Sequence, residues 1–286
     1  MGGSQKLPGD RPGTEDGEGL SISAIVGIAV VIVILVVVGG IFLNNPGLTA
    51  PAQAAPRSNT GPAVTTTQPA VPDPRDTLFQ VSTIDALAQG AYEGLMPVHE
   101  LERHGDFGTG TFDSLDGELV ALDGSYYQAR TDGSVKPADP ASMVPFAMIT
   151  VYDDDYYFEM PGGHNLSMVM ATLTTHFPSK NHIYAIRAEG KFPEMVIRAI
   201  PRQQKPYPPL AEAAGEQSII YLNETTGTLV GYYIPSFMNG VNTPGYQFHY
   251  ISADKLHGGS VLDLRTPDSG LTVHVDETTG YTSILP

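Results

Sequence analysis

The stretch Gly245–Leu264, which reads G-Y-Q-F-H-Y-I-S-A-D-K-L-H-G-G-S-V-L-D-L, decides the expected fold around the candidate site. The alternation over Tyr246–Ser252 is typical of a strand, so Gln247 and His249 should project from the same face. A polar turn follows, and a second strand is expected over Ser260–Leu264. The sequence therefore predicts a β-hairpin that brings two side chains of its first strand close to one side chain of its second.

Three side chains that converge in this way suit a metal site when all three are imidazoles. Here His249 is a histidine, but the other two positions hold Gln247 and Ser260. His257 could supply a replacement ligand, although it would have to reach past the glycines at 258–259. The alternative is that His249 is an ordinary polar residue on a half-exposed strand.

Motifs spread over the same part of the chain carry a resemblance to a known family. They are L-F-Q-V-S-T-I-D-A-L at Leu78–Leu87, H-G-D-F-G-T-G-T-F at His104–Phe112, L-D-G-E-L at Leu115–Leu119, A-L-D-G at Ala121–Gly124, P-S-K-N at Pro178–Asn181, Y-A-I-R at Tyr184–Arg187, K-P-Y-P-P-L at Lys205–Leu210, G-T-L-V-G at Gly227–Gly231 and V-L-D at Val261–Asp263. In this order they make the region from about Leu78 to Pro286 similar to the acetolactate decarboxylase family. The resemblance implies that this region has the family's fold.

The resemblance also implies a chemistry. Members of this family resemble zinc-dependent lyases that convert 2-acetolactate to acetoin and carbon dioxide. In the family, an H-x-H pair and a histidine directly after Gly-Gly hold the zinc. Those ligand positions correspond to Gln247, His249 and Ser260, so two of the three zinc histidines are replaced in this chain. We therefore expect zinc, the family's cofactor, to be absent or weakly bound here.

Three further site residues implied by the resemblance are retained as Glu118, Arg198 and Thr111. Arg198 would neutralise the substrate carboxylate or supply a proton, Glu118 would bind the substrate hydroxyl or a metal-bound water, and Thr111 would help to position the substrate. Alternatively, Arg198 is a surface arginine paired with an acid, Glu118 is a charge at a strand edge, and Thr111 is simply a residue that favours strands. The family also brings in a glutamate from a segment after its last strand, for which we expect no counterpart before Pro286.

These residues leave two functional hypotheses. In the first, the chain is a membrane-anchored acetolactate decarboxylase that acts through a rebuilt or weaker metal site. In the second, it is a catalytically inactive relative that binds a small carboxylate on Arg198, or a protein partner. The reaction needs a Lewis acid to stabilise charge on the former ketone oxygen, and an amide and a hydroxyl are weak zinc ligands. We therefore predict no stoichiometric zinc and little acetoin; the resemblance also implies a possible homodimer.

Composition excludes some classes of partner and site. The 286 residues carry a formal charge of −16, from 31 acidic and 15 basic residues. Nucleic acid is not an expected partner, because its phosphates require a basic face. Cysteine is absent, which excludes disulfides, thiolate metal sites and a cysteine nucleophile.

The N-terminal part predicts a tethered domain. Residues 1–19 are rich in Gly, Pro and acids and are expected to be disordered, whereas residues 20–43 carry no charge and are long enough for one transmembrane helix. Residues 44–76, rich in Pro, Ala and Thr, are expected to be a linker to a domain over residues 77–286. Basic residues before the span favour a cytoplasmic N-terminus and an extracytoplasmic domain. Cleavage at Ala52–Ala54 is the alternative to an anchor.

The remaining patterns predict an α+β domain with mixed, largely antiparallel sheets and few helices. A strand is expected over Phe79–Val81, and Ser82 should cap a helix with the apolar face Ile84, Leu87, Ala88, Ala91 and Leu95. Hairpins are expected across Asp123–Gly124 and around Glu189–Gly190. Asn165 or Ser167 should cap another helix, and the acidic run Asp153–Asp155 is expected to be a solvated turn rather than a calcium loop.

Overall fold

The computed structural model of the chain describes residues 74–286. The expected disordered segment, the expected membrane anchor and residues 44–73 of the expected linker lie outside this range. Within the described part of the chain, no helix is long and apolar enough to cross a membrane. A 3-10 helix over Pro74–Asp76 leads directly into the first strand, Thr77–Val81, so the described chain enters a sheet close to its start.

Seven strands form the first of two large sheets. They are β1 (Thr77–Val81), β3 (Phe107–Thr111), β4 (Glu118–Leu122), β5 (Ser125–Ala129), β6 (Val135–Pro137), β8 (Phe146–Thr150) and β15 (Gly280–Ile284). Their order across the sheet is β15-β1-β8-β3-β4-β5-β6, and every neighbouring pair is antiparallel except β1 and β15. β4 is buried along its whole length, which is expected for a strand covered on both faces.

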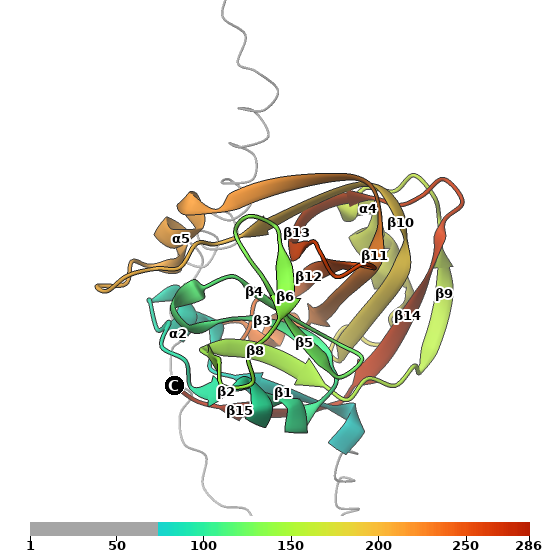
Figure 1. Ribbon diagram of the computed structural model, residues 1–286. Helices are drawn as coiled ribbons and strands as arrows, with labels where there is room; N and C mark the ends of the chain where they lie inside the picture. Colours follow the sequence, from blue (N-terminus) through green and yellow to red (C-terminus); the bar gives the residue numbers. More distant parts are fainter. Residues whose placement is uncertain (1–73) are drawn as a thin grey trace, which may run out of the picture. The chain divides into compact units, whose positions relative to one another are not determined.

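The second large sheet contains the strands that carry most of the candidate site. They are β9 (Tyr156–Met160), β10 (Ile183–Ala199), β11 (Ser218–Ile234), β12 (Gly245–Ser252), β13 (Gly258–Arg265) and β14 (Leu271–Thr278). Their order is β11-β12-β13-β10-β14-β9, and β11 also pairs with β10, so β10 to β13 close into a ring. In Figure 1 the two long strands β10 and β11 run side by side as one curved ribbon.

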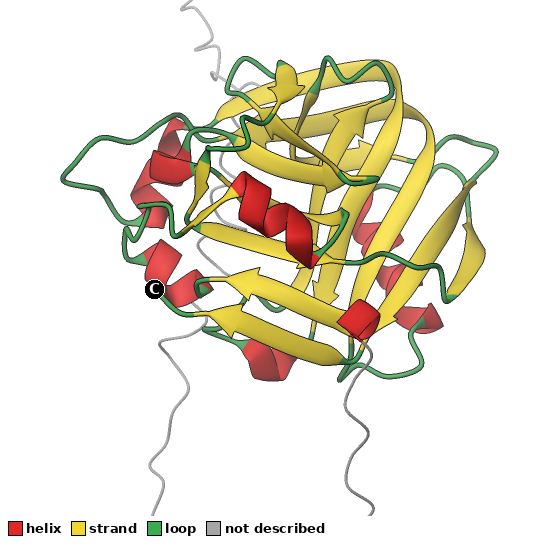
Figure 2. Cartoon of the chain, turned by 60° about the horizontal axis from the view of Figure 1, so that its bottom comes forward, coloured by secondary structure: helices red, strands yellow, loops and turns green. Residues whose placement is uncertain are grey.

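Helices are few and short in the described residues, as Figure 2 shows. They are α2 (Ile84–Ala88), α3 (Val98–Leu101), α4 (Leu166–His176) and α5 (Leu210–Ala213), and a small third sheet pairs β2 (Met96–Pro97) with β7 (Met143–Val144). Asn165 caps α4 by accepting a hydrogen bond from the backbone N–H of Met168, which confirms that predicted cap. α4 packs Val169 and Leu173 into the core of the second sheet.

The two large sheets pack against each other around β4. This strand contacts β12 and β13, and β3 contacts β11. The hydroxyl of the buried Tyr232 on β11 donates a hydrogen bond to the carbonyl of Phe107 on β3, across 3.0 Å. A residue on the inner face of β4 therefore lies close to the β12–β13 hairpin, which is where the sequence placed the candidate site.

One predicted hairpin is confirmed and another is wrong. Asp123 and Gly124 have φ values of 52° and 73° and join β4 to β5, as a tight Asp-Gly turn requires. Glu189 and Gly190 instead lie in the middle of the continuous 17-residue strand β10. The reason is that β11 pairs with β10 from Tyr184 to Ala199, so the backbone at these positions is held extended in a ladder.

The first predicted helix is shorter than expected and has a different cap. Thr83, not Ser82, accepts a hydrogen bond from the backbone N–H of Ala86, and Ser82 has a φ of 64°. The helix ends at Ala88 because Gly90 turns the chain with a φ of 93°. Ala91 and Leu95 therefore lie outside it. By contrast, the acidic run at 153–155 is exposed and lies outside the helices and strands, as predicted.

Candidate functional site

The β12–β13 hairpin brings the predicted metal-ligand positions onto one face. His249 is directly opposite Ser260, which is in turn directly opposite Arg198 on β10. Residues opposite each other in antiparallel strands have Cβ atoms about 4.5–5.5 Å apart and share a face. Gln247 lies two residues before His249 on the same face. The structure thus places four side chains in one group, which we call the hairpin row: Gln247, His249, Ser260 and Arg198.

The glycines before Ser260 explain how these strands come so close. A Cβ on Gly259 would lie 2.7 Å from the carbonyl oxygen of Arg198, and one on Gly258 would lie 2.8 Å from that of Tyr250. Both distances are too short for a side chain. The Gly-Gly pair is therefore required by the packing of β13 between β12 and β10.

The first sheet contributes Glu118 and Thr111, which are directly opposite each other on β4 and β3. Glu118 is 8% exposed, and its Oε2 lies 3.7 Å from Nε2 of His249. The hydroxyl of Thr111 donates a hydrogen bond of 2.8 Å to the carbonyl of Gly117, so it fixes the backbone immediately before Glu118. Glu118 thus faces the hairpin row directly, and Thr111 holds it there.

His249 is held in one orientation. Its Nδ1 lies 2.8 Å from the carbonyl oxygen of Leu119, which can only accept, so Nδ1 carries the proton and Nε2 presents a lone pair towards Glu118. Burial lowers the pKa of the imidazole and the nearby Arg198 cation lowers it further, against the opposing effect of Glu118. The neutral ring is therefore favoured at neutral pH.

Arg198 has hydrogen-bond donors without acceptors. Its Nε and Nη1 are buried, and neither has a hydrogen-bond partner among residues 74–286. A guanidinium does not lose its proton in proteins, so deprotonation cannot remove the charge or the unpaired donors. Arg198 is half-buried, and buried donors without acceptors cost free energy, so an anion beside Nε and Nη1 would stabilise the arrangement.

Gln247 is bound to a neighbouring loop. Its Nε2 donates hydrogen bonds of 2.8 Å to Oδ1 of Asn242 and 3.2 Å to the carbonyl of Thr243. Asn242 is fully buried and is bonded in turn to Gln80 on β1. The sequence reasoning missed this role, because neither Asn242 nor Gln80 lies in the hairpin pattern.

The donors in the hairpin row do not fit zinc. Protein zinc sites use imidazole nitrogen, thiolate or carboxylate, and the row offers one imidazole beside an amide and a hydroxyl. Among residues 74–286, no three His, Asp or Glu side chains are grouped so that they could hold a metal ion. The residues that correspond to the family's ligands therefore lack the chemistry for a tight zinc site.

His257 does not complete the set. It is exposed and lies in the β12–β13 turn, where it lines a hollow with Asp254 and Tyr221. Its carbonyl accepts a hydrogen bond from the backbone N–H of Ser252, three residues beyond His249 and so about 10 Å further along β12. The structure thus separates His257 from the hairpin row.

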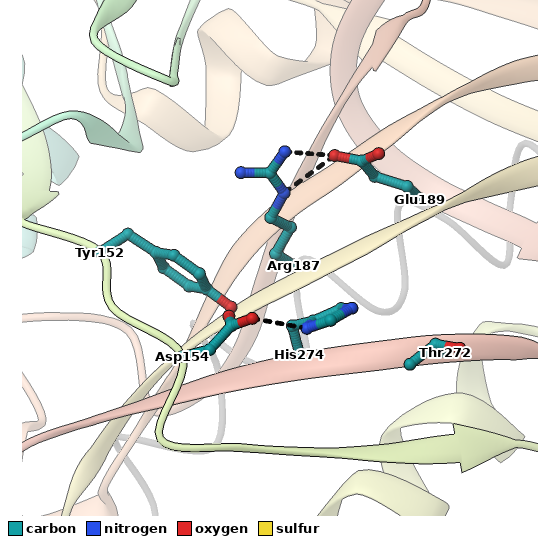
Figure 3. Close-up of a pocket in the computed structure, with 6 residues that line it drawn as sticks. All are labelled: Tyr152, Asp154, Arg187, Glu189, Thr272 and His274. Atoms are coloured by element: carbon teal, nitrogen blue, oxygen red, sulfur yellow. Dashed lines mark hydrogen bonds and ion pairs between the residues drawn. The ribbon is translucent and has the colours of Figure 1, made fainter.

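A second polar region, which the sequence analysis did not single out, lies on the other half of β10. A hollow of about 530 Å³ is lined by Tyr152, Asp154, Arg187, Glu189, Thr272 and His274 (Figure 3). Its charged groups are paired with one another: Nε of Arg187 donates to Glu189 across 2.9 Å, and Nδ1 of His274 lies 2.7 Å from Asp154. None of the hairpin row residues lines it.

Comparison with known proteins agrees with the motifs. Residues 78–286 match the family model described as Alpha-acetolactate decarboxylase. The chain is 47% identical over 189 residues to the alpha-acetolactate decarboxylase of Methanosarcina mazei, with 66% of each chain covered. It is 40% identical over 209 residues to that of Methylococcus capsulatus, with 73% of this chain and 80% of the relative covered.

The fold agrees with a solved structure as well. The crystal structure of alpha-acetolactate decarboxylase from Bacillus subtilis strain 168 superposes with a TM-score of 0.71 at 33% identity. The superposition covers 73% of this chain and 89% of that chain. The similarity therefore extends over most of the described residues.

Proposed function

Because this chain belongs to the alpha-acetolactate decarboxylase family, we propose that its domain binds a small 2-hydroxy carboxylate of the acetolactate class. Arg198 would hold the carboxylate, and binding would not need zinc. Conversion of 2-acetolactate to acetoin would then be slow or absent. The observation that carries this proposal is the pair of buried, unpartnered N–H groups on Arg198.

A carboxylate is the ligand that suits these donors best. Its oxygens accept charge-assisted hydrogen bonds from guanidinium N–H groups, and hydrogen bonds to charged groups contribute about 1.5–3 kcal/mol each. His249 in the hairpin row and Glu118 beside it can accept from a ligand hydroxyl. A 2-hydroxy carboxylate would therefore satisfy the donors of Arg198 and one of these acceptors together.

The loss of two zinc ligands accounts for the expected low activity. In the family, zinc would supply the positive charge that stabilises the enediolate formed on loss of carbon dioxide. Each 1.36 kcal/mol of lost stabilisation slows a reaction about tenfold. In this chain Glu118, Arg198 and Thr111 would still bind and orient the substrate, but no residue of the hairpin row replaces that charge at the ketone.

A slow decarboxylase is the second candidate function. It is favoured by the hydrogen bond from His249 Nδ1 to the Leu119 carbonyl, since metal-ligating histidines are usually oriented by such a bond through their other nitrogen. A weakly bound metal on His249 and Glu118 would then support slow turnover. Acetoin formation that rises with added zinc would favour this candidate.

The test is a calorimetric titration of lactate, a 2-hydroxy carboxylate, into the full chain in mild detergent. Two samples are compared, one treated with EDTA and one supplied with zinc, and acetoin formation from 2-acetolactate is assayed in both. We expect the same lactate affinity in both samples and little acetoin. Lactate binding that disappears with EDTA would contradict the proposal.

We also propose that residues 20–43 anchor the chain, with the N-terminus cytoplasmic and the domain extracytoplasmic. The support is an uncharged 24-residue segment with Lys6 and Arg11 before it. Protease added to intact cells should then remove the domain, whereas a shortened chain in the soluble fraction would indicate cleavage near Ala52–Ala54. A homodimer is a further proposal, which sedimentation of the full chain in detergent tests.

A further inference from the structure

The turn between β3 and β4, which leads directly into Glu118, has an unusual backbone. Ser114 and Leu115 have φ values of 61° and 58°, although neither residue is a glycine. Both are buried, with 4% and 2% of their surface exposed. Two consecutive residues with side chains in the left-handed region cost free energy, so the surrounding structure must hold them there.

The backbone of Ser114 is held on both sides. Its N–H donates a hydrogen bond of 2.8 Å to the carbonyl of Tyr92, and its carbonyl accepts one of 2.7 Å from the N–H of Gln203. Gln203 belongs to the loop over residues 200–209, which connects β10 to α5. Because this loop follows closely after Arg198, the segment that carries Arg198 is bonded to the β3–β4 turn.

The side chain of Ser114 lies between a carboxylate and a tyrosine. Its hydroxyl is 2.8 Å from Oδ2 of Asp113 and 2.8 Å from the hydroxyl of Tyr207, which lies on the same loop as Gln203. An ionised carboxylate can only accept, and the serine hydroxyl has a single proton. Ser114 therefore donates to Asp113, and Tyr207 donates to Ser114. The other oxygen of Asp113 accepts a hydrogen bond of 2.9 Å from the N–H of Gly94, so this carboxylate is fixed as well.

From this arrangement we propose that Tyr207 is a positioning residue for Glu118. Its hydroxyl, acting through Ser114, holds the β3–β4 turn in the left-handed conformation from which β4 starts. Thr111 fixes the end of the same turn through the Gly117 carbonyl. Together these bonds set where the Glu118 carboxylate lies relative to the hairpin row. The motif K-P-Y-P-P-L, which contains Tyr207, thereby has a role that the proposed function does not supply.

Loss of the hydroxyl is expected to loosen the turn without unfolding the domain. In Tyr207→Phe the ring remains beside that of Tyr92, whose centroid is 5.2 Å away, and both backbone hydrogen bonds of Ser114 remain. β4 also stays paired with β3 on one side and β5 on the other. The expected change is therefore a displacement of the Glu118 carboxylate at the start of β4.

The first measurement needs no ligand. Nε2 of His249 lies 3.7 Å from Oε2 of Glu118, so the nuclear magnetic resonance signal of this ring reports on the carboxylate. The full chain is prepared in detergent with isotope-labelled histidine, and His249→Gln identifies the signal. At one fixed pH, we expect Tyr207→Phe to move the signal in the same direction as Glu118→Ala, by a smaller amount. Ser114→Ala removes the partner of the tyrosine hydroxyl and should move it likewise.

The second measurement is lactate affinity, by calorimetry of the full chain in detergent. Binding of a carboxylate at Arg198, the proposed function, is needed only here. Tyr207→Phe removes one hydrogen bond from the turn and should weaken lactate binding about three- to tenfold. In the Glu118→Ala background the same change should alter the affinity by less than about twofold, because Tyr207 acts through Glu118. A residue that only supports the fold would not show this dependence.

Tyr126→Phe is the matched control, because it removes a tyrosine hydroxyl from the same sheet, where it donates across 2.9 Å to the Gly105 carbonyl. It should leave the His249 signal and lactate affinity unchanged, and a thermal melt of each variant shows that it is folded. An unmoved His249 signal in Tyr207→Phe, or an equal loss of lactate affinity with and without the Glu118 carboxylate, would overturn the inference. If the unmodified chain binds no lactate, the proposed function is wrong, and the His249 signal alone decides the role of Tyr207.

Discussion

Arg187 and Arg198 lie on the same strand, β10, but they differ in whether their hydrogen-bond donors have partners. Nη1 of Arg187 donates to Asp123 across 2.6 Å. Its Nε donates to Glu189 across 2.9 Å, as Figure 3 shows. Arg198, eleven residues along β10, keeps Nε and Nη1 buried without partners among residues 74–286. Arg187 joins the β4–β5 turn to the second sheet, whereas Arg198 keeps donors that an anion would satisfy.

The comparison shows that hollow space alone is a poor indicator of a ligand site. The hollow around Arg187 is large, yet its charged groups already pair with each other. The hairpin row matters because Nε and Nη1 of Arg198 are buried without a hydrogen-bond partner among residues 74–286. Unpaired buried groups cost free energy, so a structure that retains them is expected to satisfy them with a ligand.

The largest effect is expected from returning the zinc ligands to the hairpin row. In the double variant Gln247→His and Ser260→His, three imidazoles lie on one face, as a catalytic zinc site requires. We expect the zinc content to rise from well below one to about one ion per chain, measured by mass spectrometry of the desalted protein. No histidine precedes His99, so the predicted anchor and linker contribute no imidazole.

Each single variant serves as the control for the double one. One added imidazole leaves the set incomplete, so neither single variant should retain zinc through desalting. Gln247→His also leaves Oδ1 of Asn242 with one donor fewer, at a cost of about 1–3 kcal/mol in the free energy of unfolding. Equal zinc contents in the unmodified and double-variant chains would contradict the comparison.

The two arginines themselves provide a matched pair of substitutions. Arg198→Gln should weaken lactate binding by roughly 30- to 4,000-fold, since loss of a buried charged partner costs about 2–5 kcal/mol. Arg187→Gln should leave lactate affinity unchanged. It should cost about 0–1 kcal/mol in stability, because its partners Asp123 and Glu189 are exposed. Calorimetry and chemical denaturation measure the two quantities; equal losses of affinity would remove the distinction.

Asp276 is an acidic counterpart of Arg198, because it too is buried without a hydrogen-bond partner among the described residues. This carboxyl group on β14 is fully buried, and neither oxygen has a hydrogen-bond partner among the described residues. Burial raises its pKa to about 8, with further contributions from Asp153, Asp155 and Asp76. An unpartnered aspartate can thus become neutral by taking a proton, whereas an unpartnered arginine cannot.

This difference predicts a pH dependence of stability. The pKa of Asp276 is higher in the folded chain than the ordinary value near 3.8, so the folded state binds the proton more tightly. Stability should therefore fall as the pH rises towards 8, by an amount on the order of 3 kcal/mol between about pH 5 and 8. Asp276→Asn should remove most of that fall in urea titrations. An unchanged slope in the variant would show that Asp276 is not responsible.

The smallest effect is expected at Thr111. Thr111→Val keeps the shape of the side chain but removes the hydrogen bond to the Gly117 carbonyl. We expect a loss of about 1 kcal/mol in the free energy of unfolding and a few-fold loss of lactate affinity, because Glu118 is then held less firmly. Denaturant titration and calorimetry measure both. A variant with full stability but no lactate binding would instead indicate direct contact with the ligand.

Local sequence signals predicted much of the sheet architecture. The alternation over Tyr246–Ser252 and the Asp123–Gly124 turn were sufficient because each depends on residues close in the chain. The pair Glu189–Gly190 misled because β11, some thirty residues later, holds it in a ladder. The cap predicted at Ser82 is wrong because the sequence does not reveal the positive φ of Ser82, and Thr83 caps the helix instead.

The sequence predicted which residues share a face at the candidate site, but it did not predict the hydrogen bonds that they form. The spacing of Gln247, His249 and Ser260 indicated that they share a face, and the pairing of β12 with β13 confirms it. The hydrogen bond from Gln247 to Asn242 could not be inferred, because Asn242 is held in place by Gln80, which is 162 residues away from it in the chain. The unpaired donors of Arg198 depend on the whole packing of the two sheets, which no local pattern encodes.

We expect the site around Arg198 to hold a carboxylate without holding zinc. The most direct test is to incubate the unmodified full chain with zinc, desalt it and measure the metal by mass spectrometry while lactate binding is measured on the same sample. We expect zinc well below one ion per chain together with undiminished lactate binding. One tightly held zinc per chain, lost together with lactate binding on treatment with EDTA, would contradict it.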